Sequence, residues 1–188
     1  VNSEHTGVEF GVPVGPWRAP PNSLNVFYTE SVVDELAYMV GQDPLDYRIR
    51  LITNSPRHLS VLKQVAKQAS WGESLPEGHG RGIAINEWFP LDEKRTVVAQ
   101  VVELSVSNRG KIKLHRVDCV VDCGLAVNPD SIKAQMEGAI VMGASATLFE
   151  QITIKDGRVV ESNFDDYRIA RMKDTPKIEV SIVKSESS

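Results

Sequence analysis

The segment Trp17-Arg18-Ala19-Pro20 has the residue types and the neighbours needed to hold an anion. A turn at Gly15-Pro16 precedes it and a helix start at residues 20–23 follows, so prolines restrict the backbone on both sides. Asn22 or Ser23 is expected to cap that helix, whose first N–H groups and dipole attract negative charge. The residues alone leave two interpretations open: an anion-binding loop, or a surface loop in which the indole stacks on the guanidinium.

The cysteines and histidines are expected to have structural roles. The sequence around Cys119 and Cys123 indicates extended strand, which would separate the two residues by about 13 Å at roughly 3.3 Å per residue. A disulfide requires Cα atoms within about 7 Å, so we expect both thiols to pack on one face of that strand. The sequence has no Cys-x-x-Cys pair and no glycine-rich phosphate loop, and its histidines are scattered (His5, His58, His79, His115).

The composition indicates a globular domain rather than a nucleic-acid-binding or membrane-spanning protein. The 188 residues are 41% hydrophobic and 24% charged, and the net charge is −4 without a cluster of Lys and Arg. No apolar run approaches the roughly 20 residues that cross a bilayer, and no signal peptide is visible. Because the chain begins with Val1 and ends on the polar residues 185–188, we expect it to be a piece of a longer protein.

Helices are predicted over much of the first eighty residues. Residues 1–21 are irregular and rich in Gly and Pro, and helices are expected at 23–41, 44–52 and 56–70. The first helix has an apolar stripe at helical spacing (Val26, Val33, Leu36, Ala37, Val40). Its Glu30 and Asp34 carboxylates suit either a metal or acid–base site or a solvated helix face, and the lack of a nearby histidine favours the solvated face.

The second half of the chain is predicted to be rich in strands. Alternating apolar residues indicate strands at 81–87, 96–106 and 111–122, the last two joined by a turn at 108–110. Shorter strands are expected at 151–155, 158–162 and 177–184. We therefore expect an α+β fold in which helices pack on an antiparallel sheet. Residues 1–80 and 81–188 form its two parts, either as one compact unit or as separate domains.

A helix at 131–149 carries Gln135 at the edge of its apolar face, with Asp130 as the expected N-cap. Gly138 and Gly143 each cost roughly 1 kcal/mol of helix stability relative to alanine, which suggests that another backbone or a ligand approaches closely there. The residues leave two interpretations open: helix-on-sheet packing with Gln135 bonded to a loop, or a ligand-binding face.

Several short motifs, in one consistent order, connect the chain with an enzyme family. They are Gly15–Pro20, Glu30-Ser31, Asp34–Ala37, Gly41–Pro44 with Arg48, Val121–Gly124, Val127–Asp130, Gln135–Gly138 and Asn163–Arg168. In these motifs the chain resembles the large subunit of molybdenum hydroxylases, the family of xanthine dehydrogenases and aldehyde oxidases. It is most similar to the isoquinoline 1-oxidoreductase beta-subunit type, and the resemblance covers nearly the whole chain.

This resemblance implies that the chain is part of the molybdenum-cofactor-binding domains of such a subunit. It implies a molybdopterin cofactor in a dinucleotide form, and hydroxylation of an N-heteroaromatic or aldehyde carbon with oxygen from water. By the same resemblance, Trp17, Arg18 and Ala19 lie beside the cofactor, and Gln135 contributes a contact near the metal and the pterin. The implied partners are the remainder of the large subunit and a small subunit with two 2Fe-2S clusters, in the cytoplasm or periplasm of a bacterium.

The sequence departs from a complete member of that family. The family's general base is a glutamate in a Gly-x-Gly-Glu motif, which is expected beyond Ser188, and two glycine-containing cofactor segments are also absent. We therefore expect the chain alone to supply no catalytic residue and no metal ligand, and to bind no cofactor. Two alternatives remain: a non-catalytic binding or assembly module derived from the family, and one piece of a split large subunit.

Overall fold

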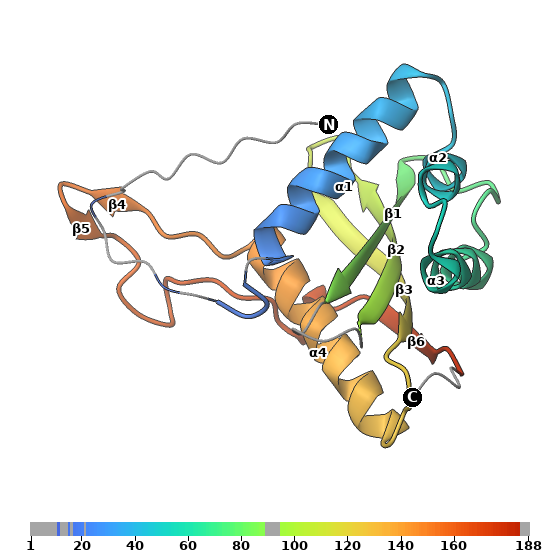
Figure 1. The fold of residues 1–188 in the computed structure, drawn as a ribbon. Helices are drawn as coiled ribbons and strands as arrows, with labels where there is room; N and C mark the ends of the chain where they lie inside the picture. Colours follow the sequence, from blue (N-terminus) through green and yellow to red (C-terminus); the bar gives the residue numbers. More distant parts are fainter. Residues whose placement is uncertain (1–10, 12–14, 16, 21, 89–94, 185–188) are drawn as a thin grey trace.

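The computed structural model describes residues 11, 15, 17–20, 22–88 and 95–184, and it confirms the expected α+β class (Figure 1). Its helices are α1 (Asn22–Met39), α2 (Pro44–Leu51), α3 (Pro56–Gln68) and α4 (Pro129–Leu148), with a 3-10 turn at Met172–Asp174. Its strands are β1 (His79–Trp88), β2 (Thr96–Val106), β3 (Ile112–Asp122), β4 (Ile154–Lys155), β5 (Arg158–Val159) and β6 (Lys177–Ile182). The long elements lie within a few residues of their predicted positions, because their apolar residues follow clear helical or strand periods. Most of the irregular segment 1–21 lies outside the described residues.

Within the described residues, four strands form the main sheet in the order β1-β2-β3-β6. The pairs β1–β2 and β2–β3 are antiparallel, as predicted, whereas β6 runs parallel to β3, with Arg116 opposite Lys177. The parallel pairing follows from the connection, since the chain crosses through α4 between β3 and β6 and returns in the same direction. The expectation of an antiparallel sheet is therefore confirmed for three strands, and the fourth makes the sheet mixed.

Helices cover both faces of this sheet (Figure 1). On one face, α3 packs in an apolar cluster with strands β1 to β3 (Val61, Leu62, Val65, Ala66, Ala69, Ile83, Val97, Ala99, Val101, Val120). On the other face, Ile140 of α4 packs with Val117 and Cys119 of β3. Burial raises the pKa of the Cys119 thiol to about 12, so this thiol stays protonated and packs as an apolar group. The structural role predicted for Cys119 is confirmed. Cys123 lies just after the end of β3 at Asp122, so the expectation that both thiols share one strand face is wrong for Cys123, and both cysteines are free thiols.

The segment after α4 extends away from the sheet as an arm (Figure 1). Its strands β4 and β5 pair over two residues each, with Ile154 opposite Val159. The strands predicted at 151–155 and 158–162 are therefore shorter than expected. The apolar side chains of β4 and β5 are about half exposed, so the pairing gains little from burial and ends close to the turn.

Arg48 joins α2 to α1 through an ion cluster that corrects the interpretation of Glu30 and Asp34. The Arg48 side chain is 2% exposed, and its Nε donates to Glu30 at 3.0 Å while its Nη1 donates to Asp34 at 2.6 Å. Its other hydrogen bonds go to the backbone carbonyls of Pro44 and Glu30. The expected solvated helix face is wrong for Glu30, whose side chain is 17% exposed, whereas Asp34 stays 46% exposed while it binds the buried arginine. Helical spacing places the two carboxylates on one face of α1 but does not specify which element covers that face.

Helix α1 also follows the outer edge of β1. The Glu30 carboxylate accepts a hydrogen bond from the backbone N–H of Ile85 at 2.9 Å, and the Asn22 side-chain amide donates to the backbone carbonyl of Glu87 at 3.1 Å. These contacts occupy backbone groups that a free edge strand leaves open to another chain. Because Asn22 and Ser23 are the first two residues of α1, neither is its N-cap, and that prediction is wrong.

Asp122 anchors the end of β3 to α3. Its carboxylate is buried and accepts two hydrogen bonds of 2.9 Å from the Arg57 guanidinium, and a third of 3.0 Å from the backbone N–H of Gly124. The bonded guanidinium, together with that backbone N–H, holds the pKa of Asp122 below its ordinary value of 3.8. The ionised form of Asp122 is therefore the form that stabilises the fold.

Replacing Asp122 with asparagine should destabilise the fold by about 2 kcal/mol at about pH 7, because the ion pair between the buried Asp122 carboxylate and Arg57 is lost. The effect stays moderate because the Arg57 side chain is 33% exposed and water can solvate its charge. A carboxyl whose pKa falls on folding stabilises the protein above its ordinary pKa, and this contribution disappears as the pH falls through the folded value. The gap between wild type and Asp122→Asn should therefore shrink below pH 3.8. Urea unfolding at about pH 7 and about pH 3 measures the gap, with the exposed Asp165→Asn as the control. An equal gap at both pH values would contradict this expectation.

Candidate functional site

Arg18 and Gln135, which are 117 residues apart in the sequence, meet between the loop before α1 and the surface of α4. The Arg18 Nη2 donates a hydrogen bond of 2.8 Å to Gln135 Oε1, and its Nη1 lies 3.9 Å from the sulfur of Met142. Gln135 and Met142 are two helical turns apart and share one face of α4. The guanidinium is therefore held at two points along this helix.

Two local features position this pair. Helix α4 begins after Asn128, whose side chain accepts a hydrogen bond of 3.0 Å from the N–H of Ser131, so the cap is Asn128 and not the predicted Asp130. In the loop, Ala19 adopts a left-handed φ of +57°, and its carbonyl accepts a hydrogen bond of 3.0 Å from the N–H of Ser23. This conformation costs an alanine about 1–2 kcal/mol, and it forms the sharp turn from the loop into α1.

The surface around the pair is open. Residues 17–19 and Gln135 are exposed, and Trp17 is 48% accessible. A Cβ atom added at Gly138 or at Gly143 would meet no atom of the described residues within 4 Å. The close approach expected at these glycines is therefore not made by the described part of the chain. Of the two interpretations of Gln135, its bond to a loop is observed, since it accepts a hydrogen bond from Arg18. The face of α4 that carries Gln135 is also exposed, so a ligand can still reach it.

Arg18 brings positive charge to this surface. Its hydrogen-bond partners among the described residues are an amide oxygen and a thioether sulfur, and neither carries a negative charge. The first turn of α1 holds no acidic residue, so the helix dipole adds to the positive potential. A guanidinium in such surroundings can bind phosphate or carboxylate oxygens through charge-assisted hydrogen bonds.

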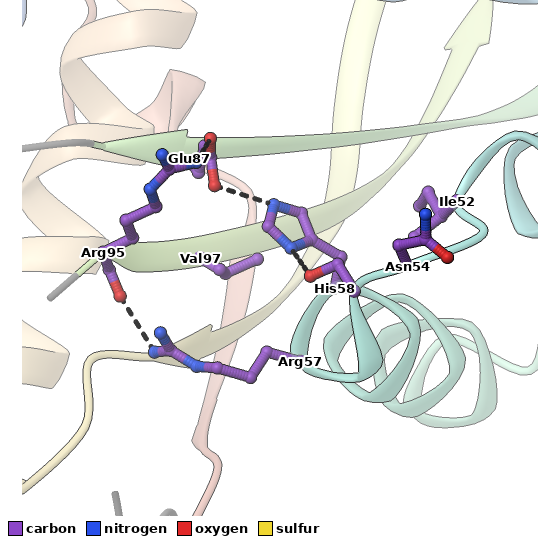
Figure 2. Close-up of a pocket in the computed structure, with 8 residues that line it drawn as sticks. Ile52, Asn54, Arg57, His58, Glu87, Arg95 and Val97 are labelled. Atoms are coloured by element: carbon purple, nitrogen blue, oxygen red, sulfur yellow. Dashed lines mark hydrogen bonds and ion pairs between the residues drawn. The ribbon is translucent and has the colours of Figure 1, made fainter. Parts of the chain in front are cut away.

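A second polar cluster lines a cavity of about 410 Å³ between α3 and the strands β1 and β2 (Figure 2). His58 lies at its centre, with Nδ1 2.5 Å from the Ser55 hydroxyl and Nε2 3.2 Å from the Glu87 carboxylate. Glu87 also pairs with Arg95 at 2.5 Å. Sequence reasoning gave His58 no specific partner, although Ser55, one helical turn before it, was a local signal. The cluster links the start of α3 to the sheet.

The other described histidines also have structural partners. The rings of His79 and His115 stack with centroids 4.4 Å apart, and they bond respectively to Glu103 at 3.3 Å and to Ser105 at 2.7 Å. His5 lies outside the described residues. In the part of the chain that the structure describes, no three His, Cys, Asp or Glu side chains gather closely enough to hold a metal ion. No helix in that part is long and apolar enough to cross a membrane.

Replacing Gly138 with alanine should stabilise the chain by roughly 0.5–1 kcal/mol, because alanine is the better helix former and the added Cβ meets no described atom. Gly157→Ala is the matched control. That position is equally open, but its φ is +74°, so alanine there should destabilise the chain. Thermal unfolding of the two variants gives the comparison. A destabilised Gly138→Ala would mean that a neighbouring segment approaches α4 at this point.

Comparison with known proteins assigns the chain to a family. Residues 29–176 match the family model of the molybdopterin cofactor-binding domain, so the chain belongs to that family. It is 33% identical over 163 residues to the beta chain of isoquinoline 1-oxidoreductase from Brevundimonas diminuta, covering 86% of this chain and 21% of that protein. It is 31% identical over 179 residues to a nicotinate dehydrogenase subunit of Pseudomonas putida KT2440, covering 88% of this chain and 15% of that protein. Quinoline 2-oxidoreductase from Pseudomonas putida 86 aligns in structure over 51% of this chain and 12% of its own, with a TM-score of 0.48 and 23% identity.

The family assignment confirms the resemblance found in the sequence motifs. Gln135 lies inside the matched range of residues 29–176, and the Trp17–Ala19 loop lies before it. The chain spans about a fifth or less of the length of the two curated relatives. The contact between Arg18 and Gln135 therefore ties the matched domain to the segment that precedes it.

Proposed function

We propose that this chain forms part of the cofactor-binding region in the large subunit of a molybdenum hydroxylase. The family match over residues 29–176 carries the proposal, because binding of molybdopterin defines that family. The two relatives are named for isoquinoline and nicotinate, which are both N-heteroaromatic compounds. We therefore propose an N-heteroaromatic compound as the substrate class of the complete enzyme, with an aldehyde as the alternative.

The open surface between residues 17–19 and α4 fits an anionic cofactor. Molybdopterin carries phosphate, and Arg18 offers guanidinium donors whose partners among the described residues are uncharged. The glycine positions of α4 leave open space beside Gln135. These observations support the proposal that Trp17, Arg18, Ala19 and Gln135 contact the cofactor, in a dinucleotide form.

The residues of this chain would bind and orient the cofactor. When bound, the cofactor supplies the oxidation of a substrate C–H group with oxygen from water. Arg18 holds its anionic groups by charge-assisted hydrogen bonds, Gln135 donates a neutral hydrogen bond that adds no charge, and the Trp17 indole keeps water from the pocket. We place the general base, a glutamate, in the remainder of the large subunit.

The surface of α1 supports a role inside a larger protein. Among the eighteen residues of α1, all of them described, Ala37 is the buried one. Large apolar side chains of this helix are more than 60% exposed (Leu24, Phe27, Tyr28, Tyr38, Met39). A helix with large apolar side chains on several sides is usually buried under other parts of a protein. We propose that the remainder of the large subunit covers α1 and that a small subunit with two 2Fe-2S clusters accepts the electrons.

The complete large subunit, purified with its iron–sulfur partner, tests this function. We expect about one molybdenum atom per large subunit, and dye reduction that is faster with isoquinoline or nicotinate than with benzaldehyde. Oxygen from ¹⁸O-labelled water should enter the product. A complete protein without molybdenum would contradict the proposal and favour a non-catalytic assembly module. Activity that requires a second, separately encoded piece would favour a split large subunit.

A further inference from the structure

We propose that Arg18 is a positioning residue that sets the orientation of the Gln135 amide. The hydrogen bond of 2.8 Å from Arg18 Nη2 to Gln135 Oε1 is the observation that carries this inference. The inference rests on the proposed function, since it concerns which atoms of α4 face the cofactor. Its test is chosen so that it can fail while the proposed function stands.

A free glutamine can present either its oxygen or its N–H₂ group to a ligand, because half a turn of the terminal amide exchanges the two. The hydrogen bond from Arg18 fixes one of these two orientations. A guanidinium is always charged and only donates hydrogen bonds, so it binds the amide oxygen. The reversed amide would place N–H₂ against the N–H donors of Arg18 and would lose a charge-assisted hydrogen bond, which is roughly twice as strong as a neutral one.

The anchored amide therefore offers N–H donors to a ligand on α4. Gln135 is exposed, and Gly138 in the next helical turn leaves open space beside it. An acceptor atom that carries no proton, such as an oxygen of an anion, is the ligand group that these donors suit. The contact between Arg18 and the Met142 sulfur, at 3.9 Å on the same face of α4, holds the guanidinium at a second point.

The test uses the complete large subunit with its iron–sulfur partner and the variants Arg18→Ala, Gln135→Ala and their combination. We expect turnover per bound molybdenum to fall about 10–100-fold in each single variant, as for other side chains that hydrogen-bond to the groups around a metal. The double variant should fall no further, because both changes remove the same oriented amide. The EPR spectrum of the reduced molybdenum centre should change in the same way in all three variants. Arg18→Ala should in addition lower the molybdenum content, since it removes a cationic contact.

Two more variants complete the experiment. Arg18→Lys keeps a charged donor and should recover most of the lost turnover, and the exposed Arg109→Ala in the β2–β3 turn should match wild type. Effects on turnover per bound molybdenum that multiply in the double variant, or a spectrum altered only by Arg18→Ala, would mean that Arg18 affects turnover independently of the Gln135 amide. Either result would overturn this inference, while the proposed contact of Arg18 with the cofactor would stand. A wild-type protein that holds no molybdenum would instead overturn the proposed function itself.

Discussion

Replacing Arg48 with methionine should destabilise the 188-residue chain by about 3–5 kcal/mol, because it breaks a buried ion cluster by removing its only cation among the described residues. The Glu30 carboxylate, 17% exposed, would lose its cationic partner. The same carboxylate accepts the N–H of Ile85, so the contact between α1 and the edge of β1 should also weaken. Urea denaturation at about pH 7 gives the difference in the free energy of unfolding.

Two further variants separate the ion cluster from the simple loss of an arginine. Arg50 lies on the same helix, is exposed and bonds to Gln42 at 2.6 Å, so Arg50→Met should change stability by less than about 0.5 kcal/mol. Adding Glu30→Gln to Arg48→Met should recover part of the loss, because the unpaired charge disappears. If Arg48→Met costs less than about 1 kcal/mol, the cluster does not hold α1 as we describe.

The 188-residue chain produced alone, in cells that make molybdopterin, should contain no molybdenum and show no hydroxylase activity. Its proposed contacts, on Trp17–Ala19 and Gln135, lie on one open surface, and the other contacts would come from the remainder of the large subunit. Each charge-assisted hydrogen bond contributes about 1.5–3 kcal/mol. The loss of two or three of them weakens binding by at least about two orders of magnitude.

Elemental analysis of the purified chain measures this expectation. The complete large subunit with its iron–sulfur partner, purified from the same cells, is the control and should contain about one molybdenum atom per chain. Near-stoichiometric molybdenum in the short chain, or dye reduction with an N-heterocycle or an aldehyde, would mean that the loop and α4 suffice to enclose the cofactor. The general base would then have to lie within this chain.

The long helices and strands could be predicted because each depends on residues close together in the sequence. The apolar residues at 97, 99 and 101 alternate with those at 98 and 102, and the structure places the two sets on opposite faces of β2. The N-cap of α4 was predicted at the wrong residue. Asn128 and Asp130 both suit an N-cap by residue type, and the signal that was missed is Pro129, because proline favours the first position of a helix and so makes Asn128 the cap.

The parallel position of β6 could not be read from its own residues. An alternating strand looks the same in a parallel and an antiparallel pair, and its direction follows from the crossover through α4. The ion cluster of Arg48 was missed for a related reason. Its two carboxylates are visible on one face of α1, but their cation comes from the next helix and is buried only when the helices pack.

By itself, the sequence determined the order of the elements, the α+β class and the membership in the molybdopterin-binding family, because periodicity and short motifs are local properties of the chain. The tertiary structure alone decided which distant side chains meet. Arg18 reaches Gln135 across 117 residues, and Arg57 reaches Asp122 across 65. Such pairs depend on how α3 and α4 lie against the sheet and on the turn at Ala19, and these arrangements result from packing over the whole molecule rather than from the spacing of the paired residues.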